Sequence, residues 1–451
     1  MDYTGESREA QHLCVLVHGL WGNPNHLQVM AASLREKHPK ESLHILVAKR
    51  NSGNFTYDGI ERGGERVCQE IEEEIEKLAE AGQEITRISL VGYSLGGLVA
   101  RYAVGLLDSK GFFKSIKPVN FTTFATPHLG VRSPLRGWHN HVWNVLGART
   151  LSASGRQLFT IDKFRETGMP LLEVLADPKS IFIKGLAKFE RRTLYTNIVN
   201  DRSAVYYTTG ISKTDPFTNI DKVKVNYLKG YEDVILDPDA PVAPLDPQEN
   251  DSSFYGTLIR GSQTTIGRLP LLITMIFLIP IGAVIFLTNS GFQSFRSSRR
   301  IQLHERGLAG NYRVPLLTGM REAVEDVYEN LNSAQSNEYL VAGTEEEAAL
   351  SEPGSHVLER APAILGNHKS DAVGGGKEKA SLQHDIPILA LAPYQFRMIQ
   401  ALDSLGWRKY PVYIHKCTHS HAAIIVRVPE KPSLQEGHVV FRHWLDEEFI
   451  L

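Results

Sequence analysis

The sequence predicts an α/β fold, with a mainly parallel sheet covered by helices on both faces. Continuous apolar runs such as residues 13–17 are typical of strands that are buried on both sides. Polar stretches with helical periodicity, such as residues 60–81, separate these runs. The third observation is the sequence Gly-Tyr-Ser-Leu-Gly at residues 92–96, between an apolar run and a helix-forming stretch. Together these features indicate βαβ units with a reactive serine at the end of one strand.

The elements of the sheet follow one another in order along the chain. Apolar runs predict strands over residues 13–17, 43–48, 87–91, 119–124, 193–199 and 410–415. Periodic stretches predict a helix directly after Ser94 and further helices over residues 25–37, 60–81, 393–405 and 439–449. Gly82 stands where the helix predicted over residues 60–81 should end, because glycine readily takes the left-handed conformation that closes a helix.

Residues 92–96 have the order of a nucleophile elbow, the sharp turn between strand and helix that exposes a serine hydroxyl in α/β-hydrolases. The turn holds the serine in a strained conformation, so small residues must flank it where the helix crosses the strand. Ser94 is therefore the predicted nucleophile, and the predicted fold class is the α/β-hydrolase fold.

A serine nucleophile needs a base within hydrogen-bonding reach and an acid that orients the base. In α/β-hydrolases these residues follow in the order serine, acid, histidine. Asp201 directly follows the strand predicted over residues 193–199 and is the predicted acid. Asp162 and Asp177 lie in a predicted cap and Asp233 follows no clear strand, so these three rank below it.

The predicted base is His421, which stands after the last predicted strand, and His419 is the alternative. His415, Cys417, His419 and His421 alternate, so on an extended strand all four would share one face. Such a set could bind zinc, but closely spaced ligands on one straight strand close poorly around a tetrahedral ion. We therefore predict a catalytic base here, and neither a metal nor a cofactor.

An oxyanion hole requires two backbone N–H groups that point at the negative charge developing on the substrate. Leu95, directly after the nucleophile, is the predicted first donor. The second should come from the loop after the first strand, at residues 18–22, where glycine allows the backbone to approach the substrate closely. Leu20 is the predicted donor in that loop.

Composition divides the chain into segments. Residues 1–235 are the predicted hydrolase core, with a helical cap inserted at about residues 132–190. The further segments are a proline- and aspartate-rich linker over 236–268, an apolar anchor over 269–288, a basic and helical connector over 289–329, a disordered low-complexity linker over 330–384, and the C-terminal part of the core over 385–451. The cap could cover an acyl pocket or form a helical subdomain that packs on the sheet.

Residues 269–288 contain no charge and have the length of a membrane-spanning helix. They separate Asp201 from His421, and both must reach Ser94, so a single full crossing would place the base on the wrong side of a bilayer. We expect the segment to enter and leave on one side, as a hairpin or an interfacial helix. Pro280 near its middle supplies a bend. Each arm of about 10 residues would be about 15 Å long, close to the depth of one lipid leaflet.

Charge and cysteine content exclude other classes of protein. The net charge is only −2, which gives no electrostatic case for a nucleic-acid partner. The three cysteines, Cys14, Cys68 and Cys417, lie far apart, which favours reduced thiols and a cytosol-facing protein. Residues 1–6 have neither a basic nor an apolar region, so no secretory signal is expected.

Several of these motifs together resemble the serine esterase family of lipase-like α/β-hydrolases. They stand at residues 17–22, 92–97, 124–130, 155–159 and 200–202. Within the family, the chain length, the late apolar segment and the ending are similar to fungal lipid-droplet phospholipases. The resemblance covers residues 10–235 and 390–450 and places the catalytic triad at Ser94, Asp201 and His421. It implies hydrolysis of glycerophospholipids at the surface of lipid droplets or of the endoplasmic reticulum membrane.

The leading interpretation is thus an interfacial serine lipid hydrolase that forms an acyl-enzyme and releases a fatty acid. Its predicted partners are the lipid substrate and a membrane or lipid-droplet surface. A neutral-lipid lipase, a small-ester esterase or an acyl transferase would use the same residues. The alternative from another class is an inactive hydrolase fold that serves as a membrane scaffold. The complete set of nucleophile, acid, base and oxyanion donors counts against the scaffold.

Overall fold

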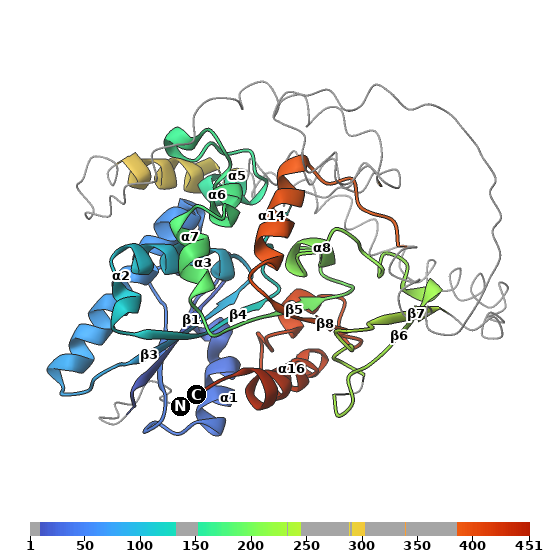
Figure 1. The fold of residues 1–451 in the computed structure, drawn as a ribbon, viewed down its shortest axis with the longest axis horizontal. Helices are drawn as coiled ribbons and strands as arrows, with labels where there is room; N and C mark the ends of the chain where they lie inside the picture. Colours follow the sequence, from blue (N-terminus) through green and yellow to red (C-terminus); the bar gives the residue numbers. More distant parts are fainter. Residues whose placement is uncertain are drawn as a thin grey trace.

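Six parallel strands form the central sheet of the computed structural model, in the order β2-β1-β3-β4-β5-β8 (Figure 1). Their bounds are β1 His12–Val17, β2 His44–Val47, β3 Arg87–Tyr93, β4 Lys117–Phe124, β5 Arg191–Asn197 and β8 Arg408–Val412. A separate antiparallel pair joins β6 (Val223–Val225) to β7 (Val242–Pro244). The structure describes residues 10–131, 152–231, 233–244, 288, 291–302, 339 and 386–451.

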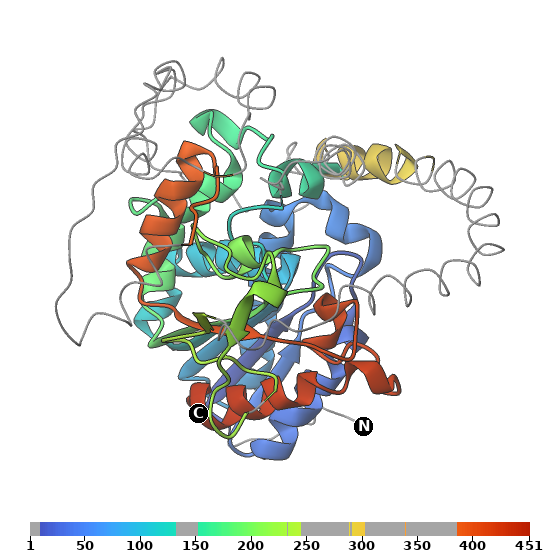
Figure 2. The same ribbon diagram turned by 90° about the vertical axis from the view of Figure 1, so that its right-hand side faces the viewer.

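Helices cover both faces of the sheet (Figures 1 and 2). One face carries α1 (Gln28–Lys37) and α16 (Gly437–His443). The other carries α2 (Ile60–Glu80), α3 (Leu95–Ser109), α7 (Ile181–Ala187) and α14 (Pro393–Asp403). The α/β fold with a mostly parallel sheet that the sequence predicts is therefore confirmed.

Two hydrophobic cores lie on opposite faces of the sheet, and β1 shows why. Successive side chains of a strand point to opposite faces. Leu13 and Val15 accordingly belong to the core under α2 and α3, whereas Cys14 and Leu16 belong to the core under α1 and α16. A strand buried on both faces must be apolar throughout, which is the pattern that predicts it from sequence.

The observed bounds differ from the predicted ones by a few residues. The main difference lies before the C-terminus, where β8 ends at Val412 and residues Ser420–Ala423 form the short helix α15. The histidines between residues 415 and 421 therefore do not share one extended strand. The terminal helix begins at Gly437 and continues beyond His443 as a π-helical turn, Trp444–Glu448.

Residues 152–190 of the predicted cap form α5 (Ser152–Leu158), α6 (Leu171–Ala176) and α7. The bulky apolar side chains of residues 152–190 belong to the core under α2 and α3. They are Phe159, Phe164, Leu171, Leu172, Phe182 and Phe189. Helix α7 packs directly on α3, where the Phe182 ring lies against Gly105. These contacts pack α7 against a helix of the hydrolase core, and the role of the cap stays a prediction.

The predicted anchor over residues 269–288 lies outside the described residues, apart from Thr288. The same holds for the predicted low-complexity linker over 330–384, apart from Tyr339. Within the part of the chain that is described, none of the helices combines the length and the apolar character that a membrane crossing needs.

Candidate active site

Ser94 lies in the turn between β3 and α3 and has a backbone conformation that an L-residue rarely adopts, with φ 54° and ψ −130°. Two backbone hydrogen bonds hold the turn. The N–H of Ser94 donates to the carbonyl of Phe124 over 2.9 Å, and the N–H of Gly97 donates to the carbonyl of Ser94 over 3.1 Å. The strain is therefore fixed by the neighbouring strand β4 and by the first turn of α3.

Small residues make this turn possible. A Cβ at Gly96 would overlap the backbone carbonyl oxygens of Val17 and His18. A Cβ at Gly19 would lie 2.7 Å from the Cβ of Ser94. The loop after β1 thus passes directly over the nucleophile, and only glycine allows it to come so close.

His421 stands next to Ser94 although 327 positions separate them in the sequence. Its Nε2 lies 2.9 Å from the Ser94 hydroxyl oxygen, and its Nδ1 lies 2.7 Å from Oδ2 of Asp201. The Tyr93 hydroxyl donates to the His421 carbonyl over 2.8 Å, which ties α15 to the end of β3. One nitrogen of the imidazole therefore faces the hydroxyl and the other faces the carboxylate.

Asp201 is buried just beyond the end of β5 and is held by four groups. Its Oδ1 accepts the backbone N–H groups of Ser203 and Ala204, both over 2.9 Å, and its Oδ2 accepts from the Asn197 amide over 3.0 Å as well as from His421. Burial alone would raise the pKa of this carboxyl, but His421 and these hydrogen bonds hold its pKa below the ordinary value. Asp201 is therefore ionised at neutral pH.

The other candidates lie elsewhere. Asp162 accepts the N–H of Leu171, and Asp177 accepts the N–H of Lys179. The carbonyl of Asp233 accepts from Nε2 of His415 over 2.6 Å.

The alternative base, His419, precedes α15 and is exposed, and its backbone N–H donates to Sγ of Cys417 over 3.3 Å. Over the described ranges, no three His, Cys, Asp or Glu side chains gather as metal ligands would.

The predicted oxyanion donors belong to two segments that meet at Ser94. Leu95 is the first residue of α3, so its N–H has no acceptor within the helix. Leu20 follows Gly19 in a tight turn closed by the N–H of Gly22 donating to the Gly19 carbonyl over 3.0 Å. Their role as donors to a substrate stays a prediction.

Two neighbouring residues were not found by the sequence analysis. Asn197, which holds Asp201, is a buried polar residue at the end of β5, and that placement is the signal that could have identified it. Tyr93 precedes the nucleophile, but its bond to the carbonyl of His421 has no local sequence signal.

The position of the site in the sheet agrees with its chemistry. Strand β1 lies between β2 and β3, so the chain leaves β1 to one side and later returns to the other. In open parallel sheets, ligands bind at such a switch point, beyond the carboxyl ends of the strands. Ser94 follows β3 and the Gly19 loop follows β1, which places both at the switch point.

Comparison with known proteins agrees with this geometry. Residues 7–214 match the family model described as "Putative serine esterase (DUF676)". This segment is therefore similar to the serine esterase family. The serine esterase segment includes Ser94 and Asp201 but not His421, which lies beyond the matched residues.

Relatives of the serine esterase segment carry lipase names. The chain is 29% identical over 246 residues to the "Putative lipase ROG1" of Saccharomyces cerevisiae, covering 52% of this chain and 34% of the relative. It is 28% identical over 242 residues to the "Putative lipase C4A8.10" of Schizosaccharomyces pombe, covering 51% of this chain and 30% of the relative. The chain thus spans about a third of the length of these relatives.

Solved structures similar to the chain include a lipase-esterase related protein from Clostridium acetobutylicum, at 11% identity and a TM-score of 0.26, covering 45% of this chain and 81% of that one.

Proposed function

We propose that the chain is a serine hydrolase that cleaves the carboxylic esters of lipids through an acyl-enzyme. The observation that carries the proposal is the continuous hydrogen-bonded series from the Ser94 hydroxyl through His421 to the buried, ionised Asp201. A catalytically silent scaffold would need neither the strained serine nor this alignment, which counts against that alternative.

Each residue would have a defined role. The Ser94 hydroxyl attacks the ester carbonyl while Nε2 of His421 takes its proton, and Asp201 stabilises the imidazolium that results. The N–H groups of Leu20 and Leu95 would donate to the oxyanion of the tetrahedral intermediate. Imidazolium then protonates the departing alcohol, and a water activated by the same histidine releases the fatty acid.

A phospholipid substrate is the finer part of the proposal. Its support is the lipase names of the relatives, the resemblance to lipid-droplet phospholipases, and the uncharged segment 269–288. We propose the cytosol-facing surface of lipid droplets or of the endoplasmic reticulum as the location. The meeting of Asp201 and His421 supports an anchor that enters and leaves on one side, because these residues stand before and after it in the sequence. Protection of a C-terminal tag from protease in sealed microsomes, with an accessible N-terminus, would contradict that topology.

The test compares the purified protein with its Ser94→Ala variant. We expect wild type to react with a fluorophosphonate probe and to release fatty acid from phospholipid-coated emulsions, and we expect the variant to do neither. Release from triacylglycerol instead of phospholipid would favour a neutral-lipid lipase. No labelling and no release by either protein would favour the scaffold.

A further inference from the structure

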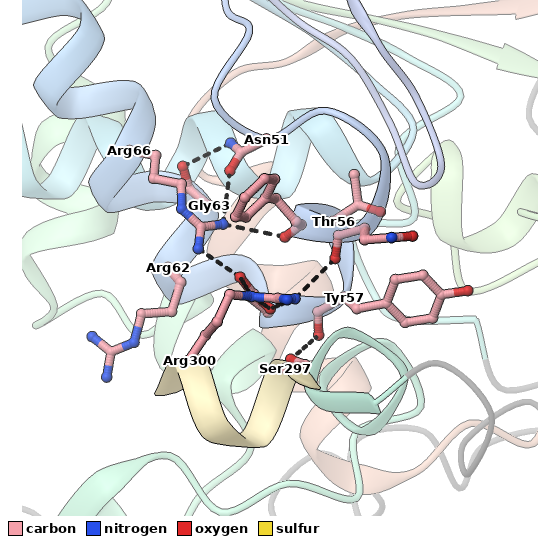
Figure 3. Close-up of polar contacts among 12 residues, drawn as sticks. Asn51, Thr56, Tyr57, Arg62, Gly63, Arg66, Ser297 and Arg300 are labelled. Atoms are coloured by element: carbon pink, nitrogen blue, oxygen red, sulfur yellow. Dashed lines mark hydrogen bonds and ion pairs between the residues drawn. The ribbon is translucent and has the colours of Figure 1, made fainter. Parts of the chain in front are cut away.

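The helix over residues 291–302, which follows the predicted anchor in the chain, is docked on the catalytic domain (Figure 3). It contacts the 3-10 segment η2 (Gly53–Asp58). The Arg300 guanidinium forms a forked ion pair with Asp58, with Nε–O distances of 3.1 and 3.0 Å and an Nη2–Oδ1 distance of 2.6 Å. The Ser297 hydroxyl donates to the Tyr57 carbonyl over 3.3 Å.

Asp58 is the centre of this contact. The residue is only 2% exposed, and its carboxylate also pairs with Arg66 at 2.5 Å. A buried carboxylate that lost its arginine partners would destabilise the folded protein, since an unpaired charge is unfavourable away from water. The position of both guanidinium groups at Asp58 is therefore important for stability. The guanidinium groups of Arg66 and Arg300 lie 5.0 and 5.1 Å from the Phe55 ring centroid, which adds cation–π contacts to the docked arrangement.

The helix has its polar side toward the protein and its aromatic side toward solvent. Gln293 and Ser297 are buried and Arg300 is half-buried, on one face at helical spacing. Phe292 and Phe295 are 57% and 69% exposed. Helices on the surface of a soluble domain normally show the opposite arrangement, so two exposed phenylalanines on one helix require an explanation.

Two exposed arginines accompany the phenylalanines. Phe292, Phe295, Arg296 and Arg299 are all exposed and form what we name the aromatic–basic face. The Arg296 guanidinium lies 5.5 Å from the Phe292 ring centroid. Exposed aromatic rings with arginines beside them are typical of helices that lie in the interface of a lipid surface, where the rings enter the acyl boundary and the cations meet anionic head groups.

The docked helix is connected to the active site through η2. Thr56 Oγ1 accepts the N–H of Trp21 over 3.1 Å, and the Trp21 indole N–H donates to the Tyr57 hydroxyl over 2.7 Å. Trp21 belongs to the loop that carries Leu20 and is itself 51% exposed. The same short segment therefore supports the predicted oxyanion loop on one side and the helix on the other.

We infer that the aromatic–basic face binds an anionic phospholipid surface, and that the Arg300–Asp58 pair fixes the orientation in which the catalytic domain meets that surface. This rests on the proposed function only in assuming that the substrate lies in the surface. Two observations indicate an anionic lipid surface as the partner of this face. One is the pair of exposed cations, Arg296 and Arg299, and the other is the uncharged segment 269–288, which ends just before the helix in the sequence. Arg300 is thus a positioning residue that acts through Asp58 and η2.

The binding arm uses the full chain with an environment-sensitive fluorophore on a cysteine at Phe295→Cys. The matched control carries the fluorophore at Leu451→Cys, another exposed apolar residue, which lies at the end of the molecule away from the helix (Figures 1 and 2). The three native cysteines are buried. With vesicles of phosphatidylcholine and phosphatidylserine, we expect a blue shift and quenching by brominated lipid at residue 295 and neither at residue 451.

Equal behaviour of the two labels would overturn the inference. A blue shift at residue 295 that brominated lipid does not quench would also overturn it, since that result indicates burial of the label against protein, either within the chain or between two copies of it. This arm does not depend on catalysis. If brominated lipid quenched the label at residue 295 but the protein released no fatty acid, the proposed function would be contradicted and the contact with lipid would still be supported.

The orientation arm uses Arg300→Gln, which removes the fork while Arg66 still partners Asp58. We expect the ratio of vesicle-phospholipid hydrolysis to hydrolysis of a soluble short-chain ester to fall about fivefold or more, and the soluble ester also reports correct folding. Arg397→Gln is the control, because it removes the same charge from another ion pair, Arg397–Glu173 at 2.8 Å. A ratio of the two activities equal to wild type in Arg300→Gln would overturn the positioning role.

Discussion

Asp201 shows how a carboxylate is kept charged in a buried place. Removal from water disfavours the ion, and the protein offsets that cost with two backbone N–H groups, the amide of Asn197 and the imidazole of His421. These contacts fix the carboxylate in position as well as in charge. The orientation of His421 toward the Ser94 hydroxyl depends on both.

Asp201→Asn tests this dependence. In the asparagine variant, the backbone N–H groups of Ser203 and Ala204 would hold the amide oxygen, so the NH2 group would face His421 and donate to its Nδ1. His421 would then carry its proton on Nε2, which is the wrong tautomer for accepting the proton of Ser94. We expect kcat to fall by about 10⁴ with little change in fold. The measurement is ester hydrolysis, with the rate of fluorophosphonate labelling as a second readout.

Asp162→Asn serves as the control for that experiment. Burial raises the pKa of the Asp162 carboxyl to about 6, and the carboxyl accepts the N–H of Leu171 away from the triad. We expect this variant to keep its activity. A loss as large as that of Asp201→Asn would contradict the assignment of the acid.

The site residues that follow the ends of strands could be predicted from the sequence. Ser94 and Asp201 each directly follow an apolar run, so local sequence alone places them at the edge of a parallel sheet. The partners of these residues could not be predicted in the same way. The contact of Tyr93 with His421 joins positions 328 apart, and only the folded chain brings them together.

The nucleophile elbow depends on backbone groups that approach more closely than a side chain would permit. Gly96→Ala would add a methyl group against the carbonyl oxygens of Val17, the last residue of β1, and of His18, which follows it. We expect a loss of about 1–3 kcal/mol of stability and a slower reaction of Ser94 with fluorophosphonate. Urea unfolding and labelling kinetics measure the two effects.

Gly291→Ala is a suitable control for the elbow variant, because no neighbouring atom of the described residues lies within 4 Å of the added methyl group. It should match wild type in both measurements. Equal effects of the two substitutions would contradict the role given to close backbone approach at Gly96.

Elements with regular patterns were predictable, and elements whose form depends on distant contacts were not. The apolar runs of β1 and β3 identify these strands directly. The segment around His421 alternates as a strand would, yet it forms the helix α15, because the N–H and hydroxyl of Ser420 donate to the carbonyls of Asn200 and Val199 after β5. The docking of residues 291–302 depends on an ion pair between positions 242 apart.

Buried histidines couple the stability of the whole molecule to pH. Burial lowers the pKa of His443 to about 4, below the value of about 6.5 expected in the unfolded chain. Between these values the unfolded chain binds a proton that the native protein does not. The contribution of His443 to the free energy of unfolding is therefore complete above pH 6.5 and decreases as pH falls toward 4, by up to about 3 kcal/mol.

His443→Gln should flatten this dependence. The variant also loses the 2.8 Å hydrogen bond to the Tyr195 hydroxyl, so we expect lower stability at pH 7.5 but a smaller further loss on going to pH 5. The midpoint of urea unfolding at the two pH values measures both. His419→Gln, at an exposed histidine, is the control and should follow wild type. An unchanged pH dependence in His443→Gln would show that other groups cause it.

The 327 positions between Ser94 and His421 have a consequence for the time course of biosynthesis. Translation delivers the nucleophile and the acid long before the base, and the apolar segment emerges between them. A nascent chain on the ribosome therefore carries an unactivated serine. The chain can therefore complete its triad only after the apolar segment 269–288 has been made and synthesis has passed His421.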